Sequence, residues 1–276
     1  MRTTGRAAVL GSPITHSLSP FLHRAAYQAM GLTGWTYEAR ECDEAGLPAM
    51  LDAEDWAGLS LTMPLKRAVL PLLDTVSDLA VAVGGANTVV FAGGARHGDN
   101  TDVHGIEQAL AEAGIPAPGS ALVLGGGATA ASALAALRGL GTGAATLVVR
   151  DPARAGETIE VAERLGMALA VETFDKLDAL LDVDLVVSTL PGGAADAFAG
   201  QAARVPALFD VVYAPWPTRL AAAVRAAGGK VVGGFPMLLH QAVRQVELMT
   251  GRTDVPVAAM RAAGEAEILR RATRTG

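Results

Sequence analysis

Residues 121–154, ALVLGGGATAASALAALRGLGTGAATLVVRDPAR, determine the fold that we expect for this chain. The stretch opens with a short apolar run at 121–124, which is typical of a buried strand and stops at three consecutive glycines. An Ala- and Leu-rich segment up to Leu140 predicts a helix, and the apolar run at 145–149 predicts a second strand. A strand, a glycine turn, a helix and a second strand form a βαβ unit, which indicates a parallel sheet.

The glycine turn predicts that a dinucleotide binds where the first strand meets the helix. Gly125, Gly127 and Ala130 fit the pattern G-x-G-x-x-G/A. The first glycine permits a tight turn, the second lets a pyrophosphate approach the backbone, and the small third residue lets helix and strand pack closely. Because the chain has 32 glycines, a purely structural turn is the alternative, but the flanking elements favour cofactor binding. We expect the helix N-terminus to face the phosphates, with contacts from Gly125, Gly126, Gly127, Ala128, Thr129 and Ala130.

The end of the second strand predicts which dinucleotide binds. An acidic residue there accepts hydrogen bonds from the ribose 2′-hydroxyl of NAD, whereas a basic residue suits the 2′-phosphate of NADP. Arg150 follows the strand directly and Arg154 lies one helical turn later, so both guanidinium groups are expected to bind one phosphate. These arginines favour NADP(H), while Asp151 between them favours NAD(H). The alternative for Arg154 is a solvated helix residue.

The composition is that of a globular protein without a nucleic-acid or membrane partner. A chain of 276 residues with 51% hydrophobic residues suffices for one large or two modest domains. The formal net charge is −6 and the sequence has no stripe of basic residues, which argues against nucleic acid as the main partner. Residues 113–137 lack charge, but Pro116, Pro118 and the glycines interrupt them, so we expect core rather than a membrane span. The single Cys42 and the absence of a signal-peptide apolar region at 1–10 predict a cytoplasmic protein.

The N-terminal third alternates apolar segments with polar loops, with strands expected at 6–10, 35–39 and 58–62 and helices at 20–30 and 43–51. The loop GSPITHSLSP at 11–20 is dense in hydroxyls, and Ser19 is the expected N-cap of the helix that begins with Pro20. Ser17 and Ser19 alternate and would face one side of an extended chain, which suits a polyhydroxylated ligand. Turn and capping roles for all of these hydroxyls are an equal alternative.

Two other polar features follow expected strands. Lys66 comes just after the third strand, where α/β sheets bind ligands, although a lysine is most often a solvated surface charge. A strand ending at Phe91, a hairpin turn at 92–95 and a return strand lead to the polar segment GDNTD at 98–102. An acid in this segment is either a helix N-cap or a metal ligand. We expect no metal, because neither calcium-loop spacing nor a histidine cluster accompanies it.

The C-terminal half continues the alternation, with a helix at 153–165, strands near 168–171, 185–189, 207–211 and 230–232, a helix opening at 234–236 and a terminal helix at 256–271. Continuous apolar strands separated by helices predict a parallel, doubly wound sheet.

Five motifs taken together resemble the shikimate 5-dehydrogenases, including their quinate/shikimate relatives. They are SPITHSLSP at 12–20, TMPLK at 62–66, GANT at 85–88, GDNTD at 98–102 and MLLHQ at 237–241. Their order and spacing around the dinucleotide unit are family-like over nearly the whole chain. The resemblance implies an α/β fold in which 1–102 and 237–276 form an α/β substrate-binding and catalytic domain. Residues 103–236 then form an NADP-binding, Rossmann-type doubly wound domain.

The resemblance also implies the role of each site residue. Lys66 and Asp102 would form the catalytic pair, and Ser17 and Ser19 would bind the substrate carboxylate. Ring hydroxyls would be contacted by Thr62, Asn87, Asp102 and Gln241, and Tyr213 would approach the substrate. Ser60 stands where many relatives have asparagine, so its hydrogen bond would be shorter or water-mediated. Further cofactor contacts are expected from Thr189, Leu190, Pro191, Val211, Gly234 and Met237.

The implied reaction is reversible hydride transfer between NADPH and 3-dehydroshikimate, giving shikimate for aromatic amino acid biosynthesis. A cationic Lys66 would stabilise the charge that builds on the carbonyl oxygen, and Asp102 would hold the ammonium in place. Val149 and Asp151 depart from the Asn-Arg-Thr pattern of the family, and Ala128 and Thr129 replace its Gly-Ala. An NAD-linked quinate/shikimate dehydrogenase and a non-catalytic ligand sensor are therefore alternatives, and the intact catalytic pair argues against the sensor. A homodimer is an assembly that the sequence leaves open.

Overall fold

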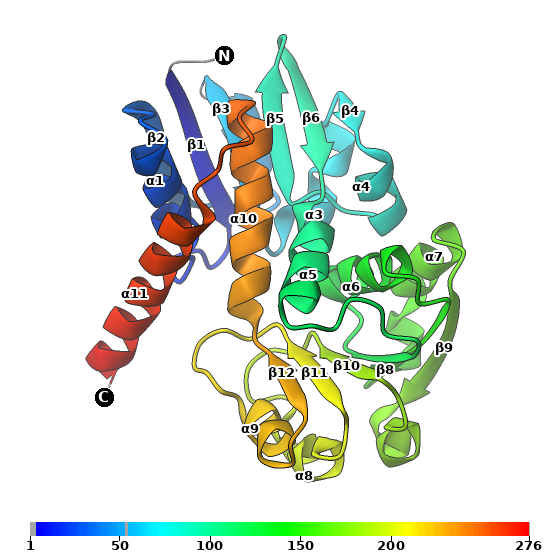
Figure 1. Ribbon diagram of the computed structural model, residues 1–276. Helices are drawn as coiled ribbons and strands as arrows, with labels where there is room; N and C mark the ends of the chain where they lie inside the picture. The colour runs from blue at the N-terminus through cyan, green and yellow to red at the C-terminus, as the bar shows by residue number, and fades with distance from the viewer. Residues whose placement is uncertain (1–3, 53–54, 276) are drawn as a thin grey trace. The chain divides into compact units, whose positions relative to one another are not determined.

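The computed structural model describes residues 4–52 and 55–275 and divides into two compact units, each built around its own sheet (Figure 1). The first unit consists of Met1–Thr101 and Leu238–Gly276, and the second consists of Asp102–Met237. Two helices contain the points where the chain passes from one unit to the other. They are α5 (Thr101–Glu112) and α10 (Gly234–Thr250). The predicted assignment of substrate and cofactor to separate domains stays a prediction at this point.

The sheet of the first unit is mixed, with the strand order β2-β1-β3-β5-β6-β4. Its strands are β1 (Thr4–Gly11), β2 (Gly34–Glu41), β3 (Trp56–Leu61), β4 (Thr75–Val76), β5 (Thr88–Ala92) and β6 (Ala95–Asp99). Strand β1 is parallel to its neighbours β2 and β3, whereas β5 is antiparallel to β3 and β6. The predicted hairpin between β5 and β6 is confirmed. Gly93 and Gly94 turn it with φ values of +61° and +81°, which L side chains rarely adopt.

The helices of the first unit are α1 (Ser19–Ala29), α2 (Leu47–Asp52), α3 (Leu65–Ala68), α4 (Asp78–Val83), most of α10 and α11 (Val257–Thr275), and α11 packs on α1. The prediction that Ser19 caps α1 is wrong. Ser19 is the first helical residue, and the hydroxyl of Ser17 accepts a hydrogen bond from its amide at 3.2 Å. The capping oxygen therefore comes from two residues earlier in the chain.

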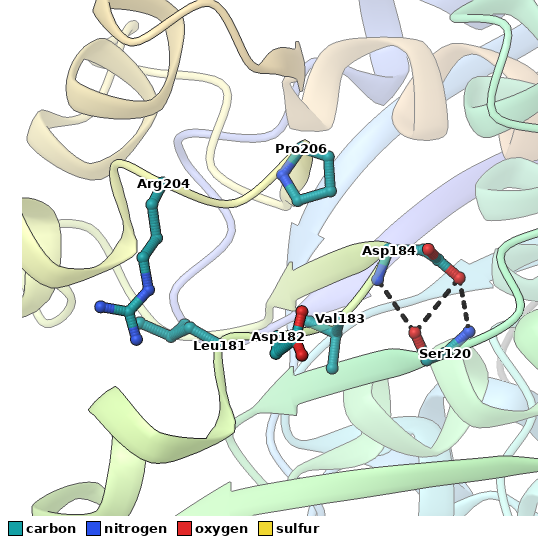
Figure 2. A pocket seen from close by; sticks show the side chains of 7 residues that line it. All are labelled: Ser120, Leu181, Asp182, Val183, Asp184, Arg204 and Pro206. Carbon is teal, nitrogen blue, oxygen red and sulfur yellow. Dashed lines mark hydrogen bonds between the residues drawn. The ribbon is translucent and has the colours of Figure 1, made fainter.

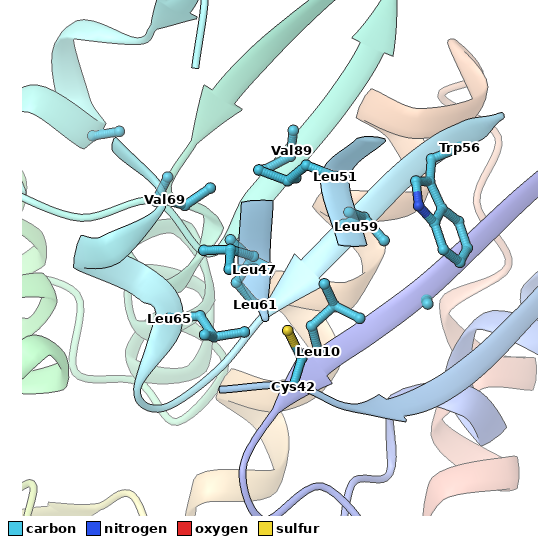
Figure 3. Packing of buried hydrophobic residues seen from close by; sticks show 13 residues of the cluster. Leu10, Cys42, Leu47, Leu51, Trp56, Leu59, Leu61, Leu65, Val69 and Val89 are labelled. Carbon is cyan, nitrogen blue, oxygen red and sulfur yellow. The ribbon is translucent and has the colours of Figure 1, made fainter. Parts of the chain in front are cut away.

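A dense apolar cluster supports this sheet (Figure 3). It includes Leu10, Cys42, Leu47, Leu51, Trp56, Leu59, Leu61, Leu65, Val69 and Val89. Trp56 is fully buried, and its indole N–H donates to the carbonyl of Met50 at 3.0 Å. The guanidinium groups of Arg6 and Arg40 lie 5.3 and 5.4 Å from the centre of the Trp56 ring. Close packing of this kind fixes the strand ends from which the polar loops leave.

The sheet of the second unit is entirely parallel, with the order β12-β11-β10-β7-β8-β9. Its strands are β7 (Ala121–Leu124), β8 (Ala144–Val149), β9 (Ala168–Thr173), β10 (Leu185–Ser188), β11 (Ala207–Asp210) and β12 (Lys230–Val232). Read from β9, this is the 3-2-1-4-5-6 order of a Rossmann fold, so the predicted doubly wound sheet is confirmed. The order reverses between β7 and β10, where such folds bind ligands.

The helices of the second unit are most of α5, α6 (Ala128–Gly139), α7 (Gly156–Arg164), α8 (Ala199–Ala202) and α9 (Arg219–Ala226). Strand β7 and most of α6 are buried, so the uncharged run is core from residue 121 onwards, whereas residues 113–120 before it are mostly exposed or half-buried. No helix within 4–52 and 55–275 has the length and apolar character needed to cross a membrane. The helix expected at 153–165 is shorter, because residues Pro152–Arg154 form a separate 3₁₀ turn.

Candidate functional site

A pocket of about 310 Å³ opens at the carboxyl ends of β7 and β8, beside the point where the strand order of the second unit reverses. It is lined by Gly125, Gly126, Gly127, Val149, Arg150, Asp151, Arg154, Phe174 and Leu190. Seven of these nine residues are ones for which the sequence predicted cofactor contact. The pocket therefore brings the glycine turn and the two arginines together.

The glycine turn has little space for side chains. Gly125 has a φ of +100°, and a Cβ added there would lie 2.6 Å from the hydroxyl of Thr189. A Cβ on Gly126 would lie 3.1 Å from a methyl group of Val149. Gly127, which precedes α6, has open space around it and no side chain caps the helix. Gly127, the N-cap of α6, lines the pocket, so the pocket borders the N-terminus of this helix, where backbone amides are available to an anion.

Asp151 has a structural partner within its own turn. Its carboxylate accepts a hydrogen bond from the amide of Ala153 at 3.0 Å and caps the 3₁₀ turn at Pro152–Arg154. Arg150 and Arg154 are exposed at the rim of the pocket, and no acidic partner of either is recorded within the described part of the chain. Two guanidinium groups that line one pocket suit a doubly charged 2′-phosphate.

The other predicted cofactor residues lie outside this pocket. Ala130 is fully buried within α6 and serves helix packing, while Ala128, Thr129, Thr189, Pro191, Val211, Gly234 and Met237 do not line the pocket. Gly234 is required for another reason, because a Cβ there would lie 1.9 Å from the carbonyl oxygen of Val211. Phe174 lines the pocket just after β9 but was not predicted, because the strand was expected to end near residue 171, two residues before its end at Thr173.

A second pocket, of about 490 Å³, lies at the opposite end of the strands of the same sheet, at the N-terminal ends of β7, β10 and β11 (Figure 2). It is lined by Ser120, Leu181, Asp182, Val183, Asp184, Arg204 and Pro206. The carboxylate of Asp184 accepts hydrogen bonds from the amide and hydroxyl of Ser120 at 2.9 and 3.1 Å. These bonds join the starts of two strands, and no residue predicted for the site lines this second pocket.

In the first unit, the predicted substrate residues Ser60, Asn87 and Gln241 belong to one network of buried hydrogen bonds. Ser60 accepts from the Tyr37 hydroxyl at 2.6 Å and donates to the side-chain oxygen of Gln245 at 2.7 Å. The Gln245 amide donates to the Asn87 carbonyl and to the Thr88 hydroxyl, at 3.3 and 3.0 Å. Since a backbone carbonyl only accepts, it fixes which end of the Gln245 amide faces Ser60.

The same reasoning fixes the side-chain amide of Asn87. Its oxygen accepts from the backbone N–H of Thr101 at 2.8 Å and from the Thr88 hydroxyl at 2.8 Å. Its nitrogen donates to Gln241 at 3.4 Å, and Gln241 donates to the Leu238 carbonyl at 2.8 Å. Asn87 therefore presents N–H donors on the side that faces Gln241.

His23 and Tyr37 close the network on the side of α1 and β2. The two rings are stacked with their centroids 3.9 Å apart, and a ring nitrogen of His23 lies 3.2 Å from the side-chain oxygen of Gln245. Complete burial lowers the pKa of His23 to about 3, although the Gln245 hydrogen bond acts in the opposite direction, so the imidazole is neutral. Burial also raises the pKa of Tyr37, while hydrogen bonds with Ser60 and Ser19 act in the opposite direction. One sequence signal could have found this network, namely the spacing of Gln241 and Gln245 by one turn of a predicted helix.

Lys66 lies in α3, directly after the loop that follows β3. Its backbone carbonyl accepts from the amide of Ala86 at 2.8 Å, which joins the TMPLK and GANT segments. A Cβ on Gly85 would lie 3.3 Å from this carbonyl oxygen. Thr62 pairs through its amide with Leu10 at 2.9 Å. The predicted motifs at 62–66 and 85–88 therefore share one backbone framework.

The remaining predicted residues belong to the second unit. Asp102 is its first residue and is 5% exposed in the first turn of α5. Tyr213 lies in the loop after β11, which the buried Asp210 holds by accepting from the amide of Val212 at 3.2 Å and from the hydroxyl of Thr218 at 2.7 Å. Burial raises the pKa of Asp210. Within the part of the chain that the structure describes, no cluster of His, Cys, Asp or Glu side chains has the form of a metal site.

The fold and the arginine-lined pocket define the chain as a two-domain α/β protein of the dinucleotide-binding class. Residues 9–89 match the shikimate dehydrogenase substrate binding domain, and residues 234–263 match the shikimate 5′-dehydrogenase C-terminal domain. Together with the relatives described next, these matches show that the chain belongs to the shikimate dehydrogenase family.

Similarity to the relatives extends over nearly the whole chain. The shikimate dehydrogenase (NADP(+)) of Citrifermentans bemidjiense is 40% identical over 271 residues, covering 91% of this chain and 92% of that protein. Shikimate dehydrogenase of Mycobacterium tuberculosis has a TM-score of 0.89 at 44% identity, covering 95% and 99% of the two chains. Shikimate 5-dehydrogenase of Thermus thermophilus, solved in complex with NADP(H) and shikimate, has a TM-score of 0.82 at 34% identity, covering 95% and 99%.

Proposed function

We propose that this chain is an NADP-dependent shikimate dehydrogenase, an oxidoreductase that reversibly reduces 3-dehydroshikimate to shikimate in aromatic amino acid biosynthesis. The observation that carries the proposal is the pocket at the switch point, where three glycines meet Arg150 and Arg154. The chain has this pocket together with the substrate-domain match at 9–89. Its relatives include NADP(+)-dependent shikimate dehydrogenases, one of them solved with both NADP(H) and shikimate.

The residues of the pocket fit NADP(H) better than NAD(H). Gly125, Gly126 and Gly127 would hold the pyrophosphate against the N-terminus of α6. Arg150 and Arg154 would bind the 2′-phosphate, and the carboxylate of Asp151 is engaged in capping its own turn. When bound, the nicotinamide supplies the hydride, and the protein supplies orientation and charge. The remaining predicted contacts, Thr189, Leu190, Pro191, Val211, Gly234 and Met237, are proposed to complete the cofactor site.

The polar residues of the first unit suit a hydroxylated, anionic substrate. Ser17 and Ser19 are proposed to bind its carboxylate, and Ser60, Thr62, Asn87 and Gln241 to contact its ring hydroxyls, with Tyr213 of the second unit also approaching the ring. The network supports this role because the Asn87 side-chain oxygen accepts from the Thr101 amide. This contact orients the Asn87 side chain so that its nitrogen is the group available as a donor. Ser60 offers the substrate an acceptor, because its only hydrogen is directed at Gln245.

Lys66 and Asp102 are proposed to be the catalytic pair. As hydride reaches the carbonyl carbon, negative charge develops on the oxygen, and the Lys66 ammonium would stabilise that charge and donate the proton. Asp102, buried in the first turn of α5, would hold the ammonium in place and accept a hydrogen bond from a substrate hydroxyl. In the oxidative direction the same lysine would receive the hydroxyl proton as the hydride leaves.

The first test is the loss of NADPH absorbance with purified protein and 3-dehydroshikimate, repeated with NADH. Fast turnover with NADPH alone is expected. Preference for NADH would move the chain to the NAD-linked quinate/shikimate branch and make Asp151 the ribose ligand. Tight binding of both ligands without turnover would favour a ligand sensor instead.

We also propose that the enzyme works in the cytoplasm with small-molecule partners and without nucleic acid or membrane. The excess of 28 acidic over 22 basic residues, together with a single cysteine, supports this setting. A homodimer is the assembly to test against a monomer, by light scattering of the purified protein at several concentrations.

A further inference from the structure

The loop that carries Ser17 is held by a residue near the other end of the chain. One terminal nitrogen of Arg271, on α11, donates to the carbonyl of His16 at 2.6 Å, and the other donates to the carbonyl of Ser17 at 3.2 Å. These two carbonyls are the last ones before the N-cap residue of α1, Leu18. One guanidinium group thus donates hydrogen bonds to two consecutive peptide carbonyls, as the planar geometry of arginine allows.

Arg271 is itself held in place. Its Nε donates to the carboxylate of Glu267 at 2.6 Å, one helical turn earlier on α11, and its guanidinium lies 5.6 Å from the centre of the Phe21 ring on α1. Glu267 is 4% exposed, so the carboxylate is shielded from water although two arginines bind it. The guanidinium that reaches the loop therefore has a fixed position before any ligand arrives.

The start of the same loop is tied by a second charged residue. The carboxylate of Glu41, at the end of β2, accepts from the Ser12 hydroxyl at 2.6 Å and from the amide of Ile14 at 3.1 Å. Between these two attachments, the amide of Ser17 donates to the carbonyl of Ile14 at 3.0 Å and forms a turn. Residues 12–18, the hydroxyl loop, are thus fixed at both ends by long-range charged contacts.

The attachment by Arg271 determines how Ser17 is presented. The oxygen of the Ser17 hydroxyl accepts the Ser19 amide at 3.2 Å, so its single hydrogen is directed elsewhere. Because Arg271 holds the Ser17 carbonyl on the side of α11, the backbone at Ser17 cannot rotate without breaking both contacts. A hydroxyl whose oxygen is already engaged is a pre-oriented donor for an anionic acceptor.

We propose that Arg271, oriented by Glu267, is a positioning residue that fixes the hydroxyl loop so that Ser17 and Ser19 bind the substrate carboxylate. The inference rests on the proposed function, specifically on the role of these two serines. Arg271 acts through the backbone of the loop and does not touch the substrate. It extends the substrate site to α11, which none of the recognised motifs includes.

Arg270 provides a matched control within the same helix. It donates to both carboxylate oxygens of Glu267 at 2.6 Å, as Arg271 does to one of them, but it makes no recorded contact with the hydroxyl loop. Arg270→Gln and Arg271→Gln therefore remove the same charge and disturb the same carboxylate. Only the second change releases the loop. Arg271→Lys retains the charge but, lacking the fork, reaches one carbonyl at most.

The test compares steady-state kinetics of shikimate oxidation by NADP⁺ in the three variants and the unsubstituted enzyme. Arg271→Gln is expected to raise KM for shikimate by about tenfold to hundredfold, the cost of a misplaced binding group, with KM for NADP⁺ within about twofold of normal. Arg271→Lys should recover part of the loss, and Arg270→Gln should leave both constants nearly unchanged. An equal rise in both KM values in Arg271→Gln would indicate a general structural defect and overturn the inference.

Shikimate methyl ester adds a readout that is specific for the carboxylate. The unsubstituted enzyme should prefer the acid to the ester in kcat/KM, and Arg271→Gln should reduce this preference by about tenfold or more, since the lost binding concerns the carboxylate. An unchanged preference in Arg271→Gln would overturn the inference. Hydrogen exchange should show faster exchange of the amides at 17–19 in Arg271→Gln alone, and normal protection there would equally overturn it.

Failure of the inference and failure of the proposed function give different results. If the unsubstituted enzyme neither binds nor oxidises shikimate, the proposed function is refuted and the inference falls with it. If the unsubstituted enzyme is active and Arg271→Gln has normal kinetics, only the inference is refuted.

Discussion

At the scale of single residues, the proposed chemistry depends most on Lys66. Its backbone is fixed by the bond from Ala86, and its side chain leaves from the short helix α3. A lysine that stabilises charge and donates a proton in the transition state acts on turnover rather than on binding. The following prediction separates this role from that of a surface charge.

Replacing Lys66 by alanine is expected to lower kcat by about a hundredfold or more, the contribution of one acid–base group. KM for shikimate should change much less, because the ring hydroxyls keep their other partners. Arg67→Ala, which removes the adjacent cation on α3, is the control and should retain most of the activity. Steady-state kinetics measure both variants, and near-normal turnover of Lys66→Ala would exclude Lys66 from the mechanism.

Arg150 carries the second prediction at this scale. Arg150→Ala should raise KM for NADPH about tenfold or more, the effect of losing one charge-assisted hydrogen bond, while KM for NADH stays nearly the same. Arg164→Ala, which removes an exposed arginine paired with Glu160 on α7, is the control for charge alone. If NADPH and NADH are affected equally by Arg150→Ala, the assignment of the 2′-phosphate is wrong.

At the scale of elements, the strand–turn–helix unit depends on two glycines for different reasons. Gly125 needs its positive φ and its lack of a side chain, whereas Gly127 has a negative φ of −93° and open space. The two positions therefore separate folding from cofactor binding, although both belong to the same motif.

Gly125→Ala is expected to lower the free energy of unfolding by about 1–3 kcal/mol, because alanine is strained at this φ and its Cβ meets Thr189. Gly127→Ala should unfold at nearly the normal denaturant concentration but bind NADPH more weakly, since its methyl group occupies space beside the helix N-terminus. Urea unfolding and a fluorescence titration with NADPH measure the two effects. Equal loss of stability in both variants would contradict the distinction.

The elements that the sequence predicted well are those with a local signal. The glycine turn and the apolar strands of the second unit predicted the doubly wound sheet, because their pattern lies within a few consecutive residues. The mixed sheet of the first unit was not predicted. Strand β4 has two residues, and the antiparallel pairing of β5 with β3 joins segments about thirty residues apart, which no local pattern reports.

The site residues were likewise predicted only in part. Asn87, Ser60 and Gln241 were predicted as site residues from the family resemblance, but Tyr37, Thr88 and Gln245 were not. These three side chains lie on three elements, β2, β5 and α10, that meet only after folding, and a buried tyrosine or glutamine looks like any core or helix residue in sequence. Arg271 was missed for the same reason, since its partners His16 and Ser17 lie 255 and 254 residues away.

At the scale of the whole molecule, buried ionisable groups make stability depend on pH. His23 is fully buried and stacked on Tyr37, and burial lowers its pKa from 6.5 to about 3. The unfolded chain binds a proton at this histidine near pH 6.5, and the folded chain does not until about pH 3. The folded state is therefore favoured above pH 6.5 and loses this advantage as the pH falls towards 3.

Glu267 also makes the folded state less stable as the pH falls, but over a lower pH range than His23. Arg270 and then Arg271 hold the pKa of its carboxyl at about 2, below the ordinary 4.5, so its stabilisation is present above pH 4.5 and is lost as the pH falls to about 2. Between pH 6.5 and 4.5, the histidine is thus the group of this pair whose titration changes stability.

His23→Phe tests this account, because phenylalanine keeps a ring beside Tyr37 and does not titrate. The free energy of unfolding of the original protein should fall by up to about 1.4 kcal/mol per pH unit more steeply than that of His23→Phe between pH 6 and 4.5. Tyr37→Phe is the control, since it removes a hydroxyl from the same network, and burial keeps that hydroxyl protonated across this range. It should lower stability by a similar amount at each pH.

Urea unfolding followed by tryptophan fluorescence measures all three proteins, because Trp35 and Trp56 are buried in the first unit. Equal slopes in the original protein and His23→Phe would mean that His23 is already protonated when folded, and the buried network would then have to accommodate a charge.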